Sequence, residues 1–279
     1  IGFCLVGSEM CIRDSFTTRT AQSVRDLNMS VFPYEHGRPV GYNAQMGLIV
    51  LQSDETLEYE LRRIFPEDGV ALYTARIPSA QQVSTNSLAE MASSLTNTAT
   101  LLPPKLNYKV VGYGCTSGAA VIGAEAVSDQ IKAGCHTAAV TEPLTALISA
   151  CQENGVRRLA ILSPYVEDVS ETLRQRLRSA GIETPQFGSF NEENETAVAH
   201  ISANSVLAAA TVLFQRGGCD AIFISCTNLQ TLDIITEIEK QCSCPVWSSN
   251  LVLGWHMLKK AGLKARSPEA GTLLHDVGL

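Results

Sequence analysis

The stretch KVVGYGCTSG, from Lys109 to Gly118, sets the interpretation of the whole chain. In it an apolar run stops at Cys115, which is followed by two hydroxyl side chains and a glycine. The stretch AIFISCTNL, from Ala221 to Leu229, repeats this order around Cys226. Short apolar runs bounded by polar and small residues are typical of buried strands. The sequence therefore predicts a thiol at the end of each of two β-strands.

Predicted strands and helices alternate along the chain. The expected strands cover 46–51, 70–77, 110–113, 137–140, 158–162, 183–190, 221–224 and a segment from Val246, and the expected helices cover 54–65, 85–101, 119–133, 143–154, 167–180, 195–216, 229–241 and 251–261. Such alternation favours parallel sheets. The two cysteines also lie almost equally far from the first strand of their own half, which indicates an internal duplication.

We predict an α/β fold of two pseudo-symmetric Rossmann-like lobes, each a parallel sheet flanked by helices, with the active site between them. The first lobe is expected to comprise 46–141 and 248–279, and the second lobe 142–247. Residues 16–45 are interpreted as an N-terminal arm. Residues 1–15 are interpreted as a non-native leader, because IGFCLVGSEMCIRDS resembles translated sequencing-adapter read-through. A real N-terminal helix or part of a signal sequence is the alternative.

The composition of the chain favours a small metabolite as its partner. The 279 residues carry a formal net charge of -7, and no run of Lys and Arg is longer than a pair. This argues against nucleic acid and anionic membranes, and no apolar run approaches the roughly 20 residues of a membrane-spanning helix. Nine cysteines, an odd number without a convincing signal peptide, indicate reduced thiols in the cytoplasm.

Neither a metal nor a cofactor is expected. The five histidines show no metal-ligand spacing, and the pair Cys242 and Cys244 has no second pair or nearby histidine. The other thiols are expected to be packing or surface residues (Cys135, Cys151 and Cys219) or parts of the leader (Cys4 and Cys11).

Cys115 and Cys226 are the predicted catalytic residues. Ligands of open parallel sheets bind beyond the carboxyl ends of the strands, where helix N-termini lower the pKa of a thiol. The residues that follow the cysteines, Thr116 with Ser117 and Thr227 with Asn228, would donate hydrogen bonds to a carboxylate or enolate. Two thiols on opposite faces of a ligand could move a proton beside a carboxylate, or one could add to a double bond while the other protonates it. A buried packing role for each cysteine is the alternative.

The motifs GYGCTSG, ISCTNL and LSPY resemble the aspartate/glutamate/hydantoin racemase superfamily, in particular its maleate cis-trans isomerase and arylmalonate decarboxylase branch. The similarity covers about residues 46 to 262, and the strings GLIVLQSDETLE and SCTNLQTLDII resemble the ectoine-utilisation group of that branch. The resemblance implies that Cys115 is the nucleophile or first proton-transfer group and that Cys226 is the second. It leaves the oligomeric state open and allows a homodimer.

The resemblance also implies substrate contacts. Tyr165 matches a tyrosine that binds a substrate carboxylate, and Asn194 matches a substrate-binding asparagine, with a plain helix cap as the alternative. Where the maleate isomerase pattern has an asparagine after the first strand, this chain has Asp54. A carboxylate there would repel a dicarboxylate, so a substrate that also carries a cation, such as the amidine of an ectoine compound, is expected to fit better. A helix cap is the alternative for Asp54.

Three functions stay open at this point. The first is a cofactor-independent racemase, epimerase or isomerase that uses both thiols, with ectoine utilisation as its expected context. The second is a decarboxylase, which needs only one thiol as a proton donor. The third is a non-catalytic sensor of a small molecule, because two α/β lobes are also typical of such binding proteins.

Overall fold

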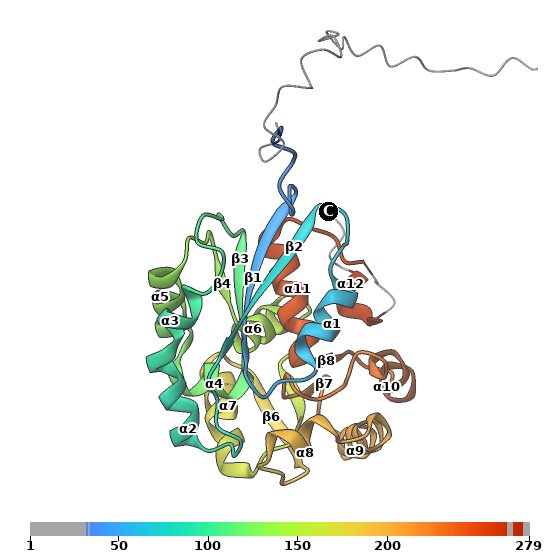
Figure 1. Ribbon diagram of the computed structural model, residues 1–279. Helices are drawn as coiled ribbons and strands as arrows, with labels where there is room; N and C mark the ends of the chain where they lie inside the picture. The colour runs from blue at the N-terminus through green and yellow to red at the C-terminus, as the bar shows by residue number, and fades with distance from the viewer. Residues whose placement is uncertain (1–31, 33, 267–269, 276–279) are drawn as a thin grey trace, which may run out of the picture. The chain divides into compact units, whose positions relative to one another are not determined.

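The computed structural model describes residue 32, residues 34–266 and residues 270–275 (Figure 1). The predicted leader, most of the predicted arm, and Cys4 with Cys11 lie outside these residues. The chain divides into two compact units, Ile1–Arg38 and Pro39–Leu279. All the helices and strands of the described residues belong to the second unit, which the following paragraphs concern.

Four parallel strands form the first sheet, in the order β2-β1-β3-β4. They are β1 (Ala44–Leu51), β2 (Val70–Ile77), β3 (Val110–Gly114) and β4 (Val140–Thr141). The central strands β1 and β3 are buried almost throughout, which explains why they read as continuous apolar runs. The helices along this half of the chain are α1 (Leu57–Ile64), α2 (Thr85–Glu90), the 3-10 helix η1 (Met91–Ser94), α3 (Leu95–Ala99), α4 (Thr116–Ile122), α5 (Ala124–Gly134) and α6 (Pro143–Glu153).

The second sheet repeats this arrangement in the order β6-β5-β7-β8, again with parallel strands. Its strands are β5 (Arg158–Ser163), β6 (Glu183–Ser189), β7 (Ala221–Ile224) and β8 (Val246–Ser248). The helices along this half are α7 (Glu167–Ser179), α8 (Glu195–Ala199), α9 (Ala203–Gln215), α10 (Ile235–Cys242), α11 (Ser249–Ala261) and α12 (Thr272–His275). The predicted α/β fold of two parallel sheets flanked by helices is confirmed. None of the described helices is long and apolar enough to cross a bilayer.

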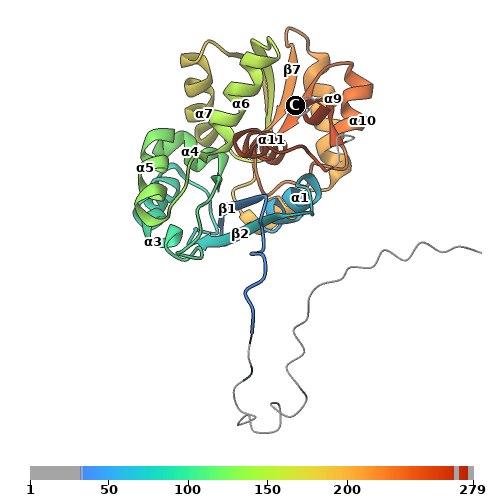
Figure 2. The same ribbon diagram turned by 90° about the horizontal axis from the view of Figure 1, so that it is seen from above.

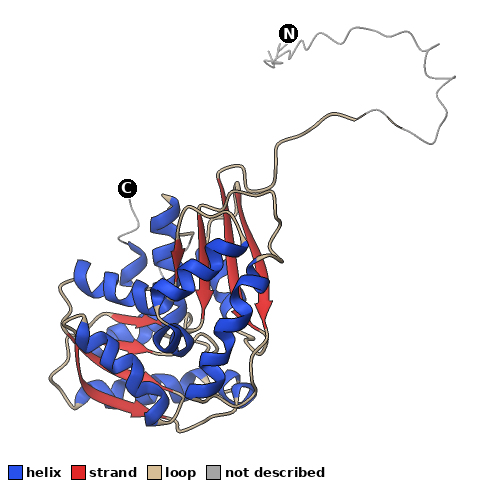
Figure 3. Cartoon of the chain, turned by 90° about the vertical axis from the view of Figure 1, so that its left-hand side faces the viewer, coloured by secondary structure: helices blue, strands red, loops and turns tan. Residues whose placement is uncertain are grey.

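The helix α11 connects the two halves. It follows β8 directly, yet Met257 of this helix packs over Gly112 of β3, where an added Cβ would lie 2.7 Å from the methionine sulfur. Gly254 of the same helix faces Leu61 and Ile64 of α1. Figure 2 shows α11 between the two halves, and Figure 3 shows the two sheets as separate sets of arrows with helices around them. Helix α11 therefore packs against elements of both halves. The division into 46–141 with 248–279 and 142–247 stays a prediction.

Several helices begin or end elsewhere than predicted. The helix after Cys115 starts at Thr116 and is broken at Gly123, whose φ of +93° is readily adopted only by glycine. The predicted helix 195–216 is two helices, because Ser202 caps a new one with its hydroxyl. The predicted helix 229–241 begins only at Ile235.

Candidate active site

The two predicted thiols lie at equivalent ends of the two sheets. Cys115 follows β3 directly, and Cys226 lies one residue after the end of β7. In the first sheet β3 neighbours β1, and in the second β7 neighbours β5, so both cysteines follow central strands. In each sheet the first central strand leads to an outer strand on one side, and the second central strand leads to an outer strand on the other side. Open parallel sheets bind ligands where the strand order changes direction in this way.

Cys115 is the N-cap residue of α4. Its Sγ accepts the backbone N–H of Gly118 at 3.2 Å, and the residue is buried. A Cβ added to Gly118 would lie 2.8 Å from both this sulfur and the Tyr113 hydroxyl oxygen. Glycine at this position therefore leaves the room that the thiol occupies.

Cys226 is held by contacts within the second half. Its Sγ accepts the backbone N–H of Asn228 at 3.3 Å and lies 3.1 Å from the hydroxyl oxygen of Tyr165. The Tyr165 hydroxyl in turn donates to Oε1 of Glu195 at 2.7 Å. A line of three polar groups, thiol, phenol and carboxyl, thus begins at this cysteine.

A hydrogen-bond chain joins the two cysteine segments. The backbone N–H of Cys226 donates to Oγ of Ser249 at 3.0 Å, and the Thr116 hydroxyl donates to the same oxygen at 2.7 Å. The Thr227 hydroxyl donates to the carbonyl of Gly114, at the end of β3, at 3.3 Å. These contacts fix the two strand ends against each other.

The pKa values of the thiols are raised, not lowered as the sequence predicted. Burial raises the pKa of Cys115 to about 12, and the N–H of Gly118 opposes this only in part. Burial also raises the pKa of Cys226 well above its ordinary value, and the charge of Glu195 adds to the effect. The predicted lowering is wrong because desolvation in the closed site outweighs the helix N-terminus. Both cysteines rest as neutral thiols at neutral pH.

Residues from both halves line one small cavity. Its volume is about 10 Å³, which is room for about one water molecule. The lining consists of Leu51, Leu88, Cys115, Thr116, Ser117, Tyr165, Glu195, Cys226 and Thr227. The structure thus brings both cysteines, the hydroxyl side chains that follow them and Tyr165 to one place. A substrate can enter only when the walls of this cavity move apart.

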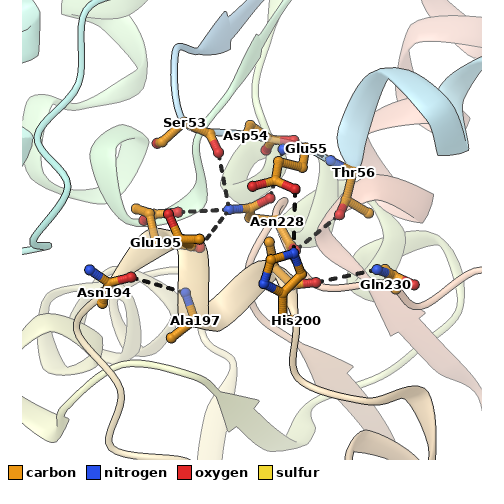
Figure 4. A network of polar contacts seen from close by, with 12 residues as sticks. Ser53, Asp54, Glu55, Thr56, Asn194, Glu195, Ala197, His200, Asn228 and Gln230 are labelled. Carbon is orange, nitrogen blue, oxygen red and sulfur yellow. Dashed lines mark hydrogen bonds and ion pairs between the residues drawn. The ribbon is translucent and has the colours of Figure 1, made fainter.

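Three predicted substrate contacts lie outside the lining: Asn228, Asn194 and Asp54. Asn228 uses its Oδ1 to accept the backbone N–H of Glu55 at 2.8 Å and its Nδ2 to donate to Glu195 Oε2 at 3.0 Å (Figure 4). Asn194 caps α8, because its Oδ1 accepts the N–H of Ala197 at 3.0 Å. The alternative interpretation of Asn194 as a helix cap therefore describes its contacts, and its role in binding substrate stays a prediction.

Asp54 also caps a helix while it acts electrostatically on the thiols. Its Oδ1 accepts the N–H groups of Thr56 at 2.9 Å and Leu57 at 2.8 Å, at the start of α1. Its Oδ2 is buried and accepts no hydrogen bond from the described residues. Burial raises the pKa of Asp54, and its charge raises the pKa of Cys115 and Cys226. Asp54 influences the site through its charge without lining the cavity.

Glu195 is the site residue that the sequence analysis missed. It is 2% exposed and lines the cavity from the first turn of α8. Burial raises its pKa, while the hydrogen bonds from Tyr165 and Asn228 oppose the increase. In the polar run FNEENETAVAH it looks like an ordinary acidic residue at a helix start. No local sequence signal distinguishes it from such a residue.

The described residues contain no group of three or more His, Cys, Asp and Glu side chains that could hold a metal ion. Among the described residues, the cysteines outside the cavity lining are free thiols: Cys135, Cys151, Cys219, Cys242 and Cys244.

The chain is similar in sequence to maleate isomerases and to an arylmalonate decarboxylase. It is 25% identical over 243 residues to a maleate isomerase of Nocardia farcinica, which covers 83% of this chain and 96% of that protein. It is 29% identical over 134 residues to the arylmalonate decarboxylase of Bordetella bronchiseptica, which covers 47% of this chain and 56% of that protein.

A solved structure shows the same fold. It is the maleate cis-trans isomerase of Nocardia farcinica, as a cysteine-to-serine mutant with a covalently bound succinylcysteine intermediate. It matches with a TM-score of 0.74 at 23% identity and covers 84% of this chain and 98% of that one. The resemblance to the ectoine-utilisation group stays a prediction. The arylmalonate decarboxylase family profile matches residues 46–274, and the chain therefore belongs to that family.

Proposed function

We propose that the protein is a cofactor-independent isomerase that interconverts the cis and trans forms of an unsaturated carboxylic acid with Cys115 and Cys226. The observation that carries this proposal is that the two thiols, one from each sheet, line the same buried cavity. A ligand held there would meet one sulfur from each half of the molecule. Relatives named maleate isomerase, at 23% to 26% identity over more than four fifths of the chain, support it.

In the proposed reaction Cys115 is the nucleophile and Cys226 is the acid. Cys115 loses its proton to solvent before the cavity closes, and its thiolate then forms a C–S bond to one carbon of the double bond. The π electrons move toward the other carbon and its carboxylate, and the S–H of Cys226 protonates that carbon. The remaining single bond rotates, Cys226 takes the proton back, and the C–S bond breaks to release the trans acid. The succinylcysteine of the solved relative supports a covalent step.

The substrate carboxylate would be bound by groups at the cavity wall. The hydroxyl side chains of Thr116, Ser117 and Thr227 line the cavity, and the first two belong to the start of α4, where backbone N–H groups have no partner within the helix. Such donors stabilise the negative charge that develops on a carboxylate during addition. The proposed partner is therefore a small carboxylate-bearing molecule. The free thiols of the described residues fit a reducing cytoplasm, which we propose as its location.

A racemase or epimerase that acts beside a carboxylate is the second candidate, and the two buried carboxyl groups favour it. Asp54 and Glu195 both raise the pKa of the thiols by their charge. Negative charge at this place disfavours a second substrate carboxylate and favours a cationic group, such as the amidine of ectoine or hydroxyectoine. One thiolate would then remove the proton beside the carboxylate, and the opposite thiol would return one. Ectoine utilisation is proposed on this ground.

One assay separates these candidates from a decarboxylase and from a sensor. The protein is incubated in D₂O with maleate, ectoine, hydroxyectoine, aspartate and phenylmalonate, and ¹H NMR follows products and deuterium uptake. Formation of fumarate supports the isomerase, deuterium entry beside the carboxylate of an ectoine compound supports the racemase, and loss of CO₂ from phenylmalonate supports a decarboxylase. Binding without any conversion would replace the proposal by the sensor.

Cysteine variants test the two-thiol mechanism. Cys115→Ala and Cys226→Ala are each expected to lower kcat by at least about 100-fold, since each removes a nucleophile or an acid–base group. Cys242→Ala is the matched control, because Cys242 is a free thiol outside the cavity lining. It should retain full turnover. Full turnover in Cys226→Ala would exclude the mechanism.

A further inference from the structure

The Tyr165 hydroxyl lies between two groups that can each hydrogen bond to it. Its oxygen is 2.7 Å from Oε1 of Glu195 and 3.1 Å from Sγ of Cys226. A phenol has one proton, so it donates to one of the two and can only accept from the other. The state of the Cys226 thiol therefore depends on which way this proton points.

The contacts of Glu195 favour one direction. Asn228 accepts the backbone N–H of Glu55 through Oδ1, so its amide NH₂ must face Glu195, where it donates to Oε2 at 3.0 Å and to the backbone carbonyl at 3.1 Å (Figure 4). Oε2 of Glu195 thus has an amide donor directed at it, and Oε1 lies 2.7 Å from the Tyr165 hydroxyl. This set of donors suits an ionised carboxylate, which accepts hydrogen bonds and donates none.

We propose that Glu195 is a positioning residue that holds the Tyr165 proton on its own side, so that Tyr165 accepts the S–H of Cys226 and this cysteine remains the protonated acid of the pair. The inference rests on the two-thiol mechanism proposed above. It gives a physical reason for the different roles proposed for the two cysteines, which their equivalent positions in the two sheets do not give.

The other thiol has a different neighbour. Cys115 lies close to the Tyr113 hydroxyl. The Tyr113 oxygen is 3.9 Å from the sulfur of Met91, which is a weak acceptor. This hydroxyl can therefore donate to a thiolate at Cys115. The titratable groups that act on Cys226 are Glu195, Tyr165 and Asp54, and Cys115 shares its cavity.

The substitution Glu195→Gln tests the arrangement. The amide NH₂ of Asn228 keeps its direction, so the glutamine carbonyl must face it and the glutamine NH₂ must face Tyr165. The Tyr165 proton then turns toward Cys226 and stabilises its thiolate. We expect iodoacetamide to modify Cys226 at least about tenfold faster at pH 8, the effect of one pKa unit. Peptide mass spectrometry measures this rate, and the rate at Cys115 reports any general opening of the cavity.

The same substitution in a Tyr165→Phe background separates the hydroxyl from the charge of Glu195. Loss of the charge, or a wider cavity, acts equally in both backgrounds, whereas the hydroxyl effect requires the phenol. The acceleration by Glu195→Gln should therefore be about tenfold smaller in that background. Equal acceleration in both backgrounds, or none in either, would overturn the proposal.

Tyr165→Phe alone gives an independent result. If Tyr165 accepts the S–H of Cys226, its removal leaves the modification rate of this cysteine unchanged or higher. A tenfold lower rate would mean that the phenol donates to the sulfur, and would also overturn the proposal. These rates are measured without substrate. A failed isomerase assay therefore leaves them interpretable, and a negative result here leaves the isomerase assay standing.

Discussion

Replacing Glu60 by alanine should destabilise the protein strongly. Glu60 is buried in α1, and its Oε1 accepts the backbone N–H groups of Thr231 at 2.6 Å and Leu232 at 2.9 Å. Its Oε2 accepts the amide of Asn250 at 2.8 Å and the Thr231 hydroxyl at 3.1 Å. All these donors come from the second half of the chain. The carboxylate therefore ties α1 to the segment that follows Cys226.

The expected loss follows from the donors left behind. The two backbone N–H groups and the Asn250 amide are held in place, whereas the Thr231 hydroxyl can rotate. Each buried donor without an acceptor costs about 1–3 kcal/mol, and the removal of a desolvated carboxylate offsets part of this. We expect Glu60→Ala to lower the free energy of unfolding by about 3–5 kcal/mol. Glu60→Gln keeps an oxygen for the backbone donors and should lose about 1–3 kcal/mol.

Urea unfolding of the purified variants measures these differences. Arg62→Ala is the matched control, because Arg62 is exposed on the same helix. It should change the free energy of unfolding by less than about 0.5 kcal/mol. If Glu60→Ala loses less than about 1 kcal/mol, or no more than Arg62→Ala, the account of the buried donors is wrong. If Glu60→Ala does not fold, Glu60→Gln decides the question.

Two further predictions concern a buried base and a buried glycine. Burial lowers the pKa of His256 from 6.5 to about 4. This difference between the unfolded and folded pKa values corresponds to up to about 3 kcal/mol of stability, which is present above pH 6.5 and is lost as the pH falls through 4. We expect His256→Gln to reduce this loss, and urea unfolding at a series of pH values measures it. An unchanged slope would contradict the assignment. Gly118→Ala should lower kcat/KM at least about 100-fold because the new Cβ displaces the Cys115 thiol. Gly188→Ala is the control and should stay near wild type, because a Cβ added there lies 3.4 Å from its nearest atom. An active Gly118→Ala enzyme would refute the packing argument.

The strands could be predicted well because burial on both faces leaves a continuous apolar run. The range 221–224 coincides with β7, which is buried throughout. The range 70–77 coincides with β2, a partly buried edge strand that Gly69 and Pro78 bound in the sequence. The helix predicted over 229–241 failed at its start for a tertiary reason. Glu60 of the other half accepts the N–H groups of Thr231 and Leu232, and no local pattern contains that information.

The predictability of the site follows the same rule. The repeated motifs around Cys115 and Cys226 predicted the positions of both thiols, because a strand end is a local feature. The pKa values could not be predicted, since they depend on how far the closed cavity excludes water. Glu195 could not be recognised either, because its burial arises only when α8 packs against Tyr165 and Asn228.

The cavity has room for about one water molecule, which limits the exchange of a transferred hydrogen with solvent. While the walls are closed, a hydrogen on a sulfur can return to the carbon from which it came before it mixes with bulk solvent. Each opening replaces it by a hydrogen from the medium. The ratio of product formed to solvent isotope incorporated therefore gives the number of chemical events per opening of the cavity. The rate of isotope uptake thus measures the motion that admits the substrate.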